Sequence, residues 1–476
     1  MSDGTGIGVL VHCRPLGLLL YSGRIDVTLD GKEVGFALTS RIGIRREDMY
    51  DWERRAPLVP EDLKRTSVAA DLEFLVQSSD KRAFSDDEYR AAGLDVVENL
   101  GGCPIVIGLK EIPTDILERD RVYVFFSHVI KGQPANMPML QRALDLGCTI
   151  IDYERIVDAS GRRLIFFGNF AGLAGMIDTL WALGRRLAHE GLHTPLATID
   201  QASTYADLAA AKAAIVKAGK RIAAEGLPEE ITPLVIGVAG YGNVSKGAQE
   251  ILDLLTVAEI SPTDLLCDSD PSWNPDRFPI AKVVFHEEDT VLRLDPSVPF
   301  DLDEYHAHPE RYRGAFERFL PKLHVLVNCI YWESRYPRLV TKEAIRSLFA
   351  ENHPRLRVIG DISCDVEGSV ETTVKATEPD DPVYVYLPAA DRAISGVEGV
   401  GPVVMAVDIL PSELPREAST YFSHTLKGFL PALVAADYSC DFETLDLPEE
   451  LKGAVITHRG SLTPEYRYLE KHLASP

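Results

Sequence analysis

Polar side chains that can move protons follow two apolar stretches in the first third of the chain. Lys110 and Glu111 come shortly after residues 105–108, and His128 comes shortly after residues 122–126. In a parallel sheet, residues beyond the carboxyl ends of the strands line the ligand crevice, so Lys110 and His128 could face each other across it. Burial disfavours the ammonium form, and such a lysine would be a base near neutral pH. The pattern predicts an acid–base pair, but a surface position is the commoner alternative.

Further charged residues near strand ends could bind carboxylate groups. Glu154 follows the strand-like residues 149–152, and Arg162 and Arg163 come shortly after it, while Arg55 lies in a charged loop near the start. An arginine can clamp a carboxylate with two parallel hydrogen bonds. The alternative is that these groups make only exposed ion pairs, which contribute little.

A glycine-rich segment at residues 234–248 predicts a nucleotide-binding turn. Residues 234–236 would form a buried parallel strand, Gly237, Gly240 and Gly242 the turn, and residues 244–255 a helix whose free N–H groups face a phosphate. The fingerprint reads G-x-A-x-x-G from Gly237 or G-x-G-x-x-S from Gly240. We favour the first register because Gly237 directly follows the apolar run. A glycine-rich turn without a ligand is the alternative.

The residues after this turn bear on the choice of nucleotide. Glu259 and Asp264 lie at about the distance expected of an acid that binds the ribose, which would favour NAD, although Glu259 could simply end a strand. No arginine occurs between residues 248 and 276 to receive a 2′-phosphate.

The sequence lacks the residues that several other kinds of enzyme or metal site would need. His306 and His308 resemble a metal pair, but no third ligand has suitable spacing and there is no H-E-x-x-H, so we expect no metal site. The sequence also has no G-x-S-x-G and no P-loop ending in Lys-Ser or Lys-Thr, which argues against a serine hydrolase and a P-loop ATPase.

Composition narrows the class further. The 476 residues carry a net charge of -23, which argues against nucleic acid or an anionic membrane as a partner. The seven cysteines include no C-x-x-C pair, which is typical of reduced thiols. No apolar run is long enough to span a bilayer, and no clear signal peptide precedes the chain, so we expect a cytoplasmic protein.

Strand-like and helix-like stretches alternate from residue 42 onward, which predicts an α/β fold with parallel sheets. We expect two Rossmann-like domains with a cleft between them. Residues 42–168 plus 397–476 would form the substrate-binding domain and residues 169–396 the dinucleotide-binding domain. The return to the first domain would run through residues 403–407 and a helical stretch at 416–435. Residues 1–41 form an N-terminal extension of unknown role, in which residues 24–36 alternate and could form a hairpin.

Eight longer motifs indicate a protein family. They comprise Ile44-Arg-Arg-Glu-Asp, Trp52-Glu-Arg-Arg-Ala-Pro-Leu, Phe126-Ser-His, Ile151-Asp-Tyr-Glu, Gly240-Tyr-Gly-Asn-Val-Ser-Lys-Gly-Ala-Gln, Asn328-Cys-Ile-Tyr-Trp-Glu, Asp361-Ile-Ser-Cys-Asp and Leu410-Pro-Ser-Glu-Leu-Pro-Arg-Glu-Ala. Through them the chain from Ile42 onward resembles lysine-2-oxoglutarate reductases, also called lysine-forming saccharopine dehydrogenases. It is most similar to the reductase half of bifunctional aminoadipic semialdehyde synthases.

The resemblance implies the reductive condensation of lysine with 2-oxoglutarate to saccharopine, in which NAD(P)H reduces an imine. The acid–base residues of the family fall on Lys110 and His128, and acidic neighbours that adjust the charge of the lysine on Glu111 and Glu154. Arg55, Lys131 and Arg163 match positions suited to the substrate carboxylates, and Glu53 could meet a substrate ammonium.

For the cofactor, the resemblance implies contacts from two of the motifs and favours NADPH over NADH. These contacts would involve Gly237, Gly240, Tyr241, Gly242, Asn243 and Val244 in the glycine turn, and Asp361 and Asp365 further on. Because the chain ends without the glutamate-forming half of the bifunctional enzymes, we expect another enzyme to take saccharopine onward. Two alternatives stay open: an alanine-dehydrogenase-like enzyme acting on a smaller 2-oxo acid, and a dinucleotide-binding sensor without turnover.

Overall fold

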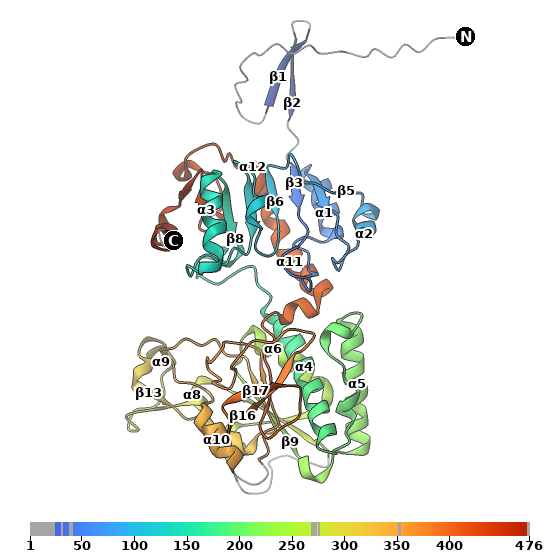
Figure 1. Cartoon of the computed structure of the whole chain (residues 1–476), viewed down its shortest axis with the longest axis vertical. Helices are drawn as coiled ribbons and strands as arrows, with labels where there is room; N and C mark the ends of the chain where they lie inside the picture. Colours follow the sequence, from blue (N-terminus) through green and yellow to red (C-terminus); the bar gives the residue numbers. More distant parts are fainter. Residues whose placement is uncertain are drawn as a thin grey trace, which may run out of the picture.

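The computed structural model describes residues 41–267, 274, 277–350 and 354–473, together with the backbone of two strands nearer the N-terminus. Those strands, β1 (Arg24–Leu29) and β2 (Lys32–Ala37), pair antiparallel, as the alternating pattern predicts. The rest of the predicted N-terminal extension before residue 41 lies outside the described residues. The chain from residue 41 forms two lobes, one above the other in Figure 1.

The first lobe is built on an eight-stranded sheet in the order β20-β19-β8-β7-β6-β3-β4-β5. The strands from β5 to β8 are parallel, and β19 and β20 add antiparallel at one edge. Parallel strands need both faces covered, which explains their continuous apolar sequences. The strands are β3 (Arg41–Ile44), β4 (Glu73–Gln77), β5 (Asp95–Val97), β6 (Ile105–Ile107), β7 (Val122–Phe125), β8 (Thr149–Asp152), β19 (Val455–His458) and β20 (Ser461–Leu462).

Helices from both ends of the chain cover this sheet. The serine that precedes α2 accepts a hydrogen bond from the backbone of Glu88, whose side chain bonds back, so a capping box starts that helix. Phe422 and Leu426 of α11 are buried in the same core as the strands, although they lie far along the chain. The helices are α1 (Pro60–Ala70), α2 (Asp86–Ala91), α3 (Met137–Asp145), α11 (Pro415–Leu426), α12 (Leu430–Ala435), α13 (Glu449–Lys452) and α14 (Glu470–Leu473).

The second lobe contains another eight-stranded sheet, in the order β10-β11-β9-β14-β15-β18-β16-β17. It is parallel from β10 to β18, and β16 and β17 complete it antiparallel. The strands are β9 (Leu234–Ala239), β10 (Val257–Ile260), β11 (Ile280–Phe285), β14 (Val325–Asn328), β15 (Val358–Asp361), β16 (Val383–Leu387), β17 (Arg392–Ser395) and β18 (Val403–Met405).

Each face of this sheet has its own hydrophobic core. Helices α4 (Gly168–His189), α5 (Leu208–Glu225) and α6 (Asn243–Leu252) cover one face. Helices α7 (Pro262–Leu266) and α10 (Lys342–Ala350) cover the other. Helices α4 and α6 cross closely because glycines meet there: a Cβ on Gly172 would lie 1.9 Å from the carbonyl oxygen of Val244.

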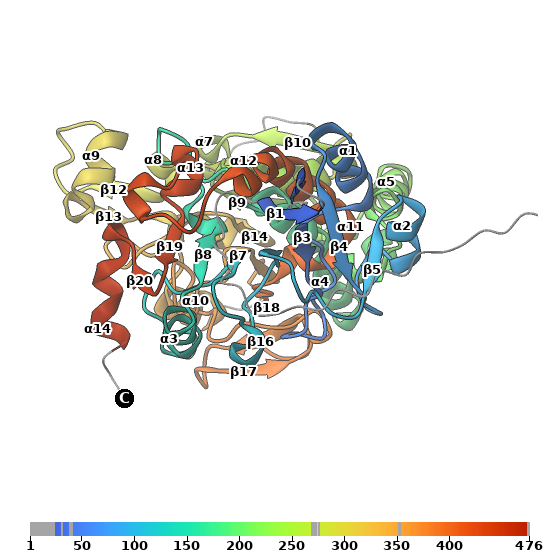
Figure 2. The same cartoon turned by 90° about the horizontal axis from the view of Figure 1, so that it is seen from above.

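A small folded insertion follows β11. It contains α8 (Glu287–Thr290), β12 (Val291–Arg293), α9 (Leu302–Ala307) and β13 (Tyr312–Gly314). Val291, Tyr305 and Tyr312 form a small apolar cluster of its own. The insertion projects from one edge of the lower lobe in Figure 1 and at the periphery in Figure 2.

One expected boundary is wrong. Residues 403–407 were predicted to carry the chain back to the first lobe, but β18 pairs with β15 and β16 inside the second sheet. A short apolar strand carries no signal that says which of two sheets it joins. The return therefore occurs after β18, where the chain leads into α11. Among the described helices, none is long and apolar enough to cross a membrane.

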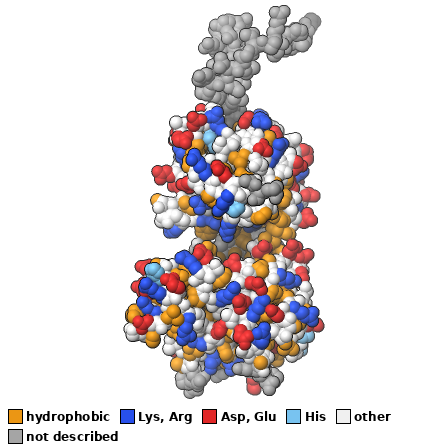
Figure 3. Space-filling model, turned by 60° about the vertical axis from the view of Figure 1, so that its left-hand side comes forward, with side chains coloured by type: hydrophobic (Ala, Val, Ile, Leu, Met, Phe, Trp, Pro, Cys, Tyr) orange, Lys and Arg blue, Asp and Glu red, His pale blue; other side chains and the backbone are white. Residues whose placement is uncertain are grey.

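The two lobes leave a hollow between them, visible in Figure 3. Its wall includes Lys131 and Phe166 from the first lobe and many residues of the second. The expected architecture of two α/β domains with a cleft between them is confirmed.

Candidate functional site

Lys110 lies just beyond the carboxyl end of β6, in a segment that is fixed from behind. The buried Glu47 carboxylate accepts hydrogen bonds from the backbone N–H groups of Leu109 (2.8 Å) and Lys110 (2.9 Å). The Tyr153 hydroxyl donates to the carbonyl oxygen of Gly108 at 2.9 Å. These contacts hold the backbone of Lys110, so its side chain has a defined origin.

Glu47 was not singled out from the sequence, yet it is one of the main supports of this segment. Burial raises the pKa of Glu47 to about 7, although Arg45 and the backbone N–H groups of Lys110 and Leu109 favour its charged form. The signal for it in the sequence is only its place in the Ile44-Arg-Arg-Glu-Asp motif.

The Lys110 ammonium is surrounded by charges of both signs. Burial and the positive charge of Arg55 lower the pKa of Lys110, and Glu53, Glu111 and Asp408 act in the opposite direction. Asp408, from the segment after β18, was missed because nothing in the sequence indicates that this segment approaches the first lobe. A lowered pKa is the property expected of a lysine that acts as a base near neutral pH.

His128 follows β7 and forms a pair with Glu111. The Nδ1 atom of His128 lies 2.5 Å from Oε1 of Glu111. Burial opposes ionisation of this carboxyl group, but the hydrogen bond and charge of His128 outweigh it, so the pKa of Glu111 is lowered. Asp152 accepts hydrogen bonds from the backbone and the hydroxyl of Ser127 and so anchors the turn before His128.

Glu53 and Arg55 are bound to each other rather than exposed to the cleft. Arg55 donates through Nε (2.8 Å) and Nη2 (2.5 Å) to the two oxygens of Glu53, and both side chains are buried. The guanidinium also lies 4.5 Å above the ring of Phe167. A substrate carboxylate can therefore meet only the part of the guanidinium that Glu53 does not occupy.

The remaining predicted substrate residues lie further apart. Arg163 donates to Glu154 at 3.0 Å, and the arginine side chain is largely exposed, which matches the alternative of a surface ion pair. Lys131 lines the cleft. Burial raises the pKa of Asp365, and the positive charge of Lys131 acts in the opposite direction. The structure thus brings Lys110, His128, Glu111 and the Glu53–Arg55 pair together and places Glu154 and Arg163 at the side.

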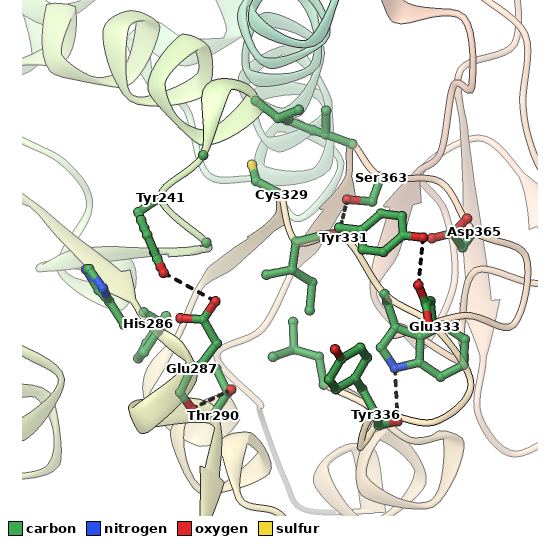
Figure 4. A pocket seen from close by; sticks show the side chains of 18 of the residues that line it. Tyr241, His286, Glu287, Thr290, Cys329, Tyr331, Glu333, Tyr336, Ser363 and Asp365 are labelled. Carbon is green, nitrogen blue, oxygen red and sulfur yellow. Dashed lines mark hydrogen bonds between the residues drawn. The ribbon is translucent and has the colours of Figure 1, made fainter. Parts of the chain in front are cut away.

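A pocket of about 970 Å³ occupies the second-lobe side of the cleft. Gly240, Tyr241, Gly242, Asn243 and Val244 all line it. Figure 4 shows Tyr241, His286 and Glu287 on one side and Tyr331, Ser363 and Asp365 on the other, with Cys329 between them.

The glycine turn is built as a dinucleotide would require. Gly240 has a φ of 97°, and a Cβ there would lie 3.2 Å from the carbonyl oxygen of Cys329. Helix α6 begins at Asn243 without a side-chain cap, so its first N–H groups face the pocket without an intrahelical partner. This arrangement fits the pyrophosphate of a dinucleotide.

Two of the expected cofactor contacts need correction. Gly237 lies inside strand β9, where a Cβ would be 2.7 Å from the ring of Phe285, so the first register is wrong and the turn starts at Gly240. Asp361 is buried behind the pocket, where Asn328 donates to it at 2.8 Å and Thr373 also donates to it. Asp365 does line the pocket.

The acids expected near the ribose lie elsewhere. Glu259 forms an ion pair with Lys282 (3.0 Å), and Asp264 caps helix α7 together with Ser261. Neither lines the pocket, whereas Glu287 does. Among the side chains that the structure describes, no group of three or more His, Cys, Asp or Glu residues is arranged to hold a metal ion.

Comparisons with known proteins support the two-lobed fold. Residues 43–174 match the family model described as alanine dehydrogenase/PNT, N-terminal domain. A solved L-alanine dehydrogenase superposes with a TM-score of 0.59 at 16% identity, covering 91% of this chain and 100% of its own. The fold is therefore that of the alanine dehydrogenase and transhydrogenase class.

The chain is also similar in sequence to several named enzymes. The alpha-aminoadipic semialdehyde synthase of Arabidopsis thaliana is 38% identical over 90% of this chain and 41% of its own length. The corresponding protein of Rattus norvegicus, named as mitochondrial, is 35% identical over 90% of this chain and 47% of its own. The saccharopine dehydrogenase [NAD(+), L-lysine-forming] of Emericella nidulans is 27% identical over 80% of this chain and 88% of its own.

The resemblance seen in the motifs is thus confirmed: the chain is a relative of aminoadipic semialdehyde synthases and of lysine-forming saccharopine dehydrogenases. It spans less than half the length of the synthases it matches.

Proposed function

We propose that the protein condenses L-lysine with 2-oxoglutarate and reduces the product to saccharopine, using a nicotinamide dinucleotide. The observation that carries this proposal is the half-buried Lys110 of lowered pKa near the His128–Glu111 pair. The fungal relative that is covered over 88% of its length supports it through its name.

The reaction needs three changes at one carbon atom. The ε-amine of lysine attacks the keto carbon of 2-oxoglutarate, the keto oxygen leaves as water, and the resulting carbon–nitrogen double bond is reduced. When bound, the reduced nicotinamide supplies the hydride for the last change. The balance is lysine, 2-oxoglutarate, reduced nucleotide and one proton to saccharopine, oxidised nucleotide and water.

The residues of the first lobe would handle the protons. Lys110, with its pKa lowered by burial and by Arg55, accepts a proton from the ε-ammonium of the substrate and so frees the attacking amine. His128 carries the proton that the departing oxygen needs, and Glu111 orients the His128 ring through its contact with Nδ1.

Substrate charges would be met by the surrounding groups. Lys131 faces the pocket and suits a carboxylate of 2-oxoglutarate, as does the part of Arg55 that Glu53 leaves unoccupied. Glu53 suits the α-ammonium of lysine if substrate binding loosens its contact with Arg55. Arg163 would contribute at the rim.

The proposed reaction can use either NADH or NADPH as its reductant. The motif resemblance favours NADPH, whereas the fungal relatives carry NAD(+) in their names. We also propose that another enzyme takes saccharopine onward and that the protein is cytoplasmic. The rodent relatives, by contrast, are named as mitochondrial.

The test is to follow the absorbance of NADH and of NADPH with lysine plus 2-oxoglutarate, and to identify saccharopine by mass. We expect oxidation only when both substrates are present. Oxidation with pyruvate and ammonia instead would favour an alanine-dehydrogenase-like enzyme. Nucleotide binding without turnover on either pair would favour the sensor.

A further inference from the structure

The strand order of the second sheet determines which residues lie beside the glycine turn. Strand β11 is the neighbour of β9, with Phe285 opposite Ala239, and β10 lies beyond it at the edge. The Gly240 N–H donates to the carbonyl oxygen of Phe285 at 2.9 Å. The residues that follow β11 therefore lie next to the turn, although β10 comes first along the chain.

Glu287 is the acidic residue at this place. It lies two positions beyond β11 and lines the pocket. The Tyr241 hydroxyl lies 3.4 Å from Glu287 Oε1, and the Tyr241 ring stacks on His286 with centroids 4.3 Å apart. In Figure 4 the carboxylate of Glu287 points into the pocket below Tyr241.

We propose that Glu287 binds the hydroxyl groups of the adenosine ribose and makes the site selective for NADH over NADPH. This inference rests on the proposed function for the presence of a nicotinamide dinucleotide. Two ribose hydroxyls can both donate to a carboxylate, and charge-assisted hydrogen bonds of this kind are among the strong ones. A 2′-phosphate would instead bring up to about two negative charges against the Glu287 carboxylate.

Among the described residues that line the pocket, we find no cation free to compensate a phosphate beside Glu287. The described lining contains two cationic side chains, Lys131 and Arg338. Lys131 comes from the other lobe. Arg338 is bound to Glu371 at 3.1 Å and to two backbone carbonyl oxygens, and its guanidinium lies over Trp332.

Glu259, the acid that sequence spacing suggested, is in a different situation. Lys282 lies 3.0 Å from Glu259 and 2.8 Å from Asp253, so the charge of Glu259 is already paired on the edge side of the sheet. Glu259 therefore serves as the internal control for the proposal.

The experiment is a fluorescence titration of the whole protein with NADH and with NADPH, without lysine or 2-oxoglutarate. The wild-type protein should bind NADH more tightly, by roughly tenfold or more. Glu287→Gln should weaken NADH binding about tenfold and shrink the preference. Glu259→Gln and Glu288→Gln should leave the preference as it is, since Glu288 is exposed and does not line the pocket.

A wild-type preference for NADPH would overturn the inference, as would a changed preference in Glu259→Gln but not in Glu287→Gln. Failure of the wild type to bind either nucleotide would overturn both the inference and the proposed function. Normal selectivity without saccharopine formation would leave Glu287 in its role and refute only the proposed reaction.

Discussion

The two lobes present their functional groups by different means. In the first lobe charged side chains follow the ends of β6 and β7, and buried carboxylates behind them hold the backbone: Glu47 holds Lys110, and Asp152 holds the turn before His128. In the second lobe the glycine turn offers backbone N–H groups, and it contains no charged side chain between Gly240 and Val244. The first site depends on which residues are present, and the second depends on how the backbone is folded.

The two lobes also differ in the free energy needed to keep their supporting groups charged. Burial raises the pKa of Asp152 to about 6 and that of Glu47 to about 7, so these supports are costly to keep charged. The second lobe avoids that cost by using peptide dipoles at the amino end of α6. Mutations should therefore act on turnover in the first lobe and on nucleotide affinity in the second.

The largest expected effect is on turnover. Lys110→Met and His128→Gln should each lower kcat on the order of a hundredfold or more, because each removes a proton carrier. Nucleotide affinity should stay nearly unchanged, since the described pocket lining does not include either residue. Steady-state kinetics and nucleotide titration of the same preparations measure the two effects.

The exposed Lys64→Met variant on α1 is the matched control for the lysine, and its kcat should equal that of the wild type. Wild-type rates in both Lys110→Met and His128→Gln would refute the acid–base pair. A large loss of affinity in either would break the division between the lobes.

A smaller effect is expected from the second lobe. Gly240→Ala should weaken the binding of both NADH and NADPH by about tenfold, because a side chain at a φ of 97° strains the turn by about 1–2 kcal/mol. The new Cβ would also lie 3.1 Å from the Ile330 side chain. Titration with each nucleotide measures the change.

Gly191→Ala supplies the control. Gly191 also has a positive φ (79°), but it lies at the end of α4, and a Cβ there would meet no atom within 4 Å. The Gly191→Ala variant should be less stable than the wild type but should bind both nucleotides as tightly. Equal affinity losses in the two variants would mean that the turn acts only through stability.

Much of the fold follows from patterns in the sequence. The apolar runs at residues 105–108 and 122–126 predicted β6 and β7 to within one residue, because parallel strands must be buried on both faces. The sequence could not show that β18 stays in the second sheet or that β10 lies outside β11. Both depend on strand order, which is set by packing between segments distant in the chain.

The site divides in the same way. Lys110 and His128 were recognisable because a titratable residue just after an apolar strand is a local signal. Asp408 comes from a segment about 300 positions further along the chain than Lys110, and Glu287 replaces Glu259 only because of the strand order. The pairing of Glu53 with Arg55 was also not predicted, since both had been assigned to substrate.

The segments that join the lobes contain a third arrangement, a buried pair of acids. Asp178 of α4 accepts a hydrogen bond from the backbone of Ala202 (2.8 Å), and Glu413 accepts one from Ser203 (3.2 Å). Each acid also has a buried oxygen that receives no hydrogen bond from the described residues, Asp178 Oδ2 and Glu413 Oε1. Because two neighbouring buried charges would repel each other, we expect the two carboxyl groups to share one proton. Burial and the charge of Asp178 raise the pKa of Glu413 well above its ordinary value.

The smallest expected effect comes from this pair. Because the folded state holds the proton more tightly than the unfolded state, its contribution to stability is complete below the unfolded pKa of about 4.5 and is lost as pH rises through the raised pKa of Glu413. Glu413→Gln keeps an oxygen for Ser203 and places an amide donor opposite Asp178. The free energy of unfolding should then fall less between pH 5 and pH 9, by about 1–3 kcal/mol.

Urea denaturation at several pH values measures this change, and the exposed Glu230→Gln variant controls for the loss of one charge. An equal decline in Glu413→Gln and the wild type would show that the pair does not share a proton in the folded state. Since α4 belongs to the second lobe and Glu413 precedes α11 of the first, a flatter profile would locate a pH-sensitive contact at the junction itself, outside both sites.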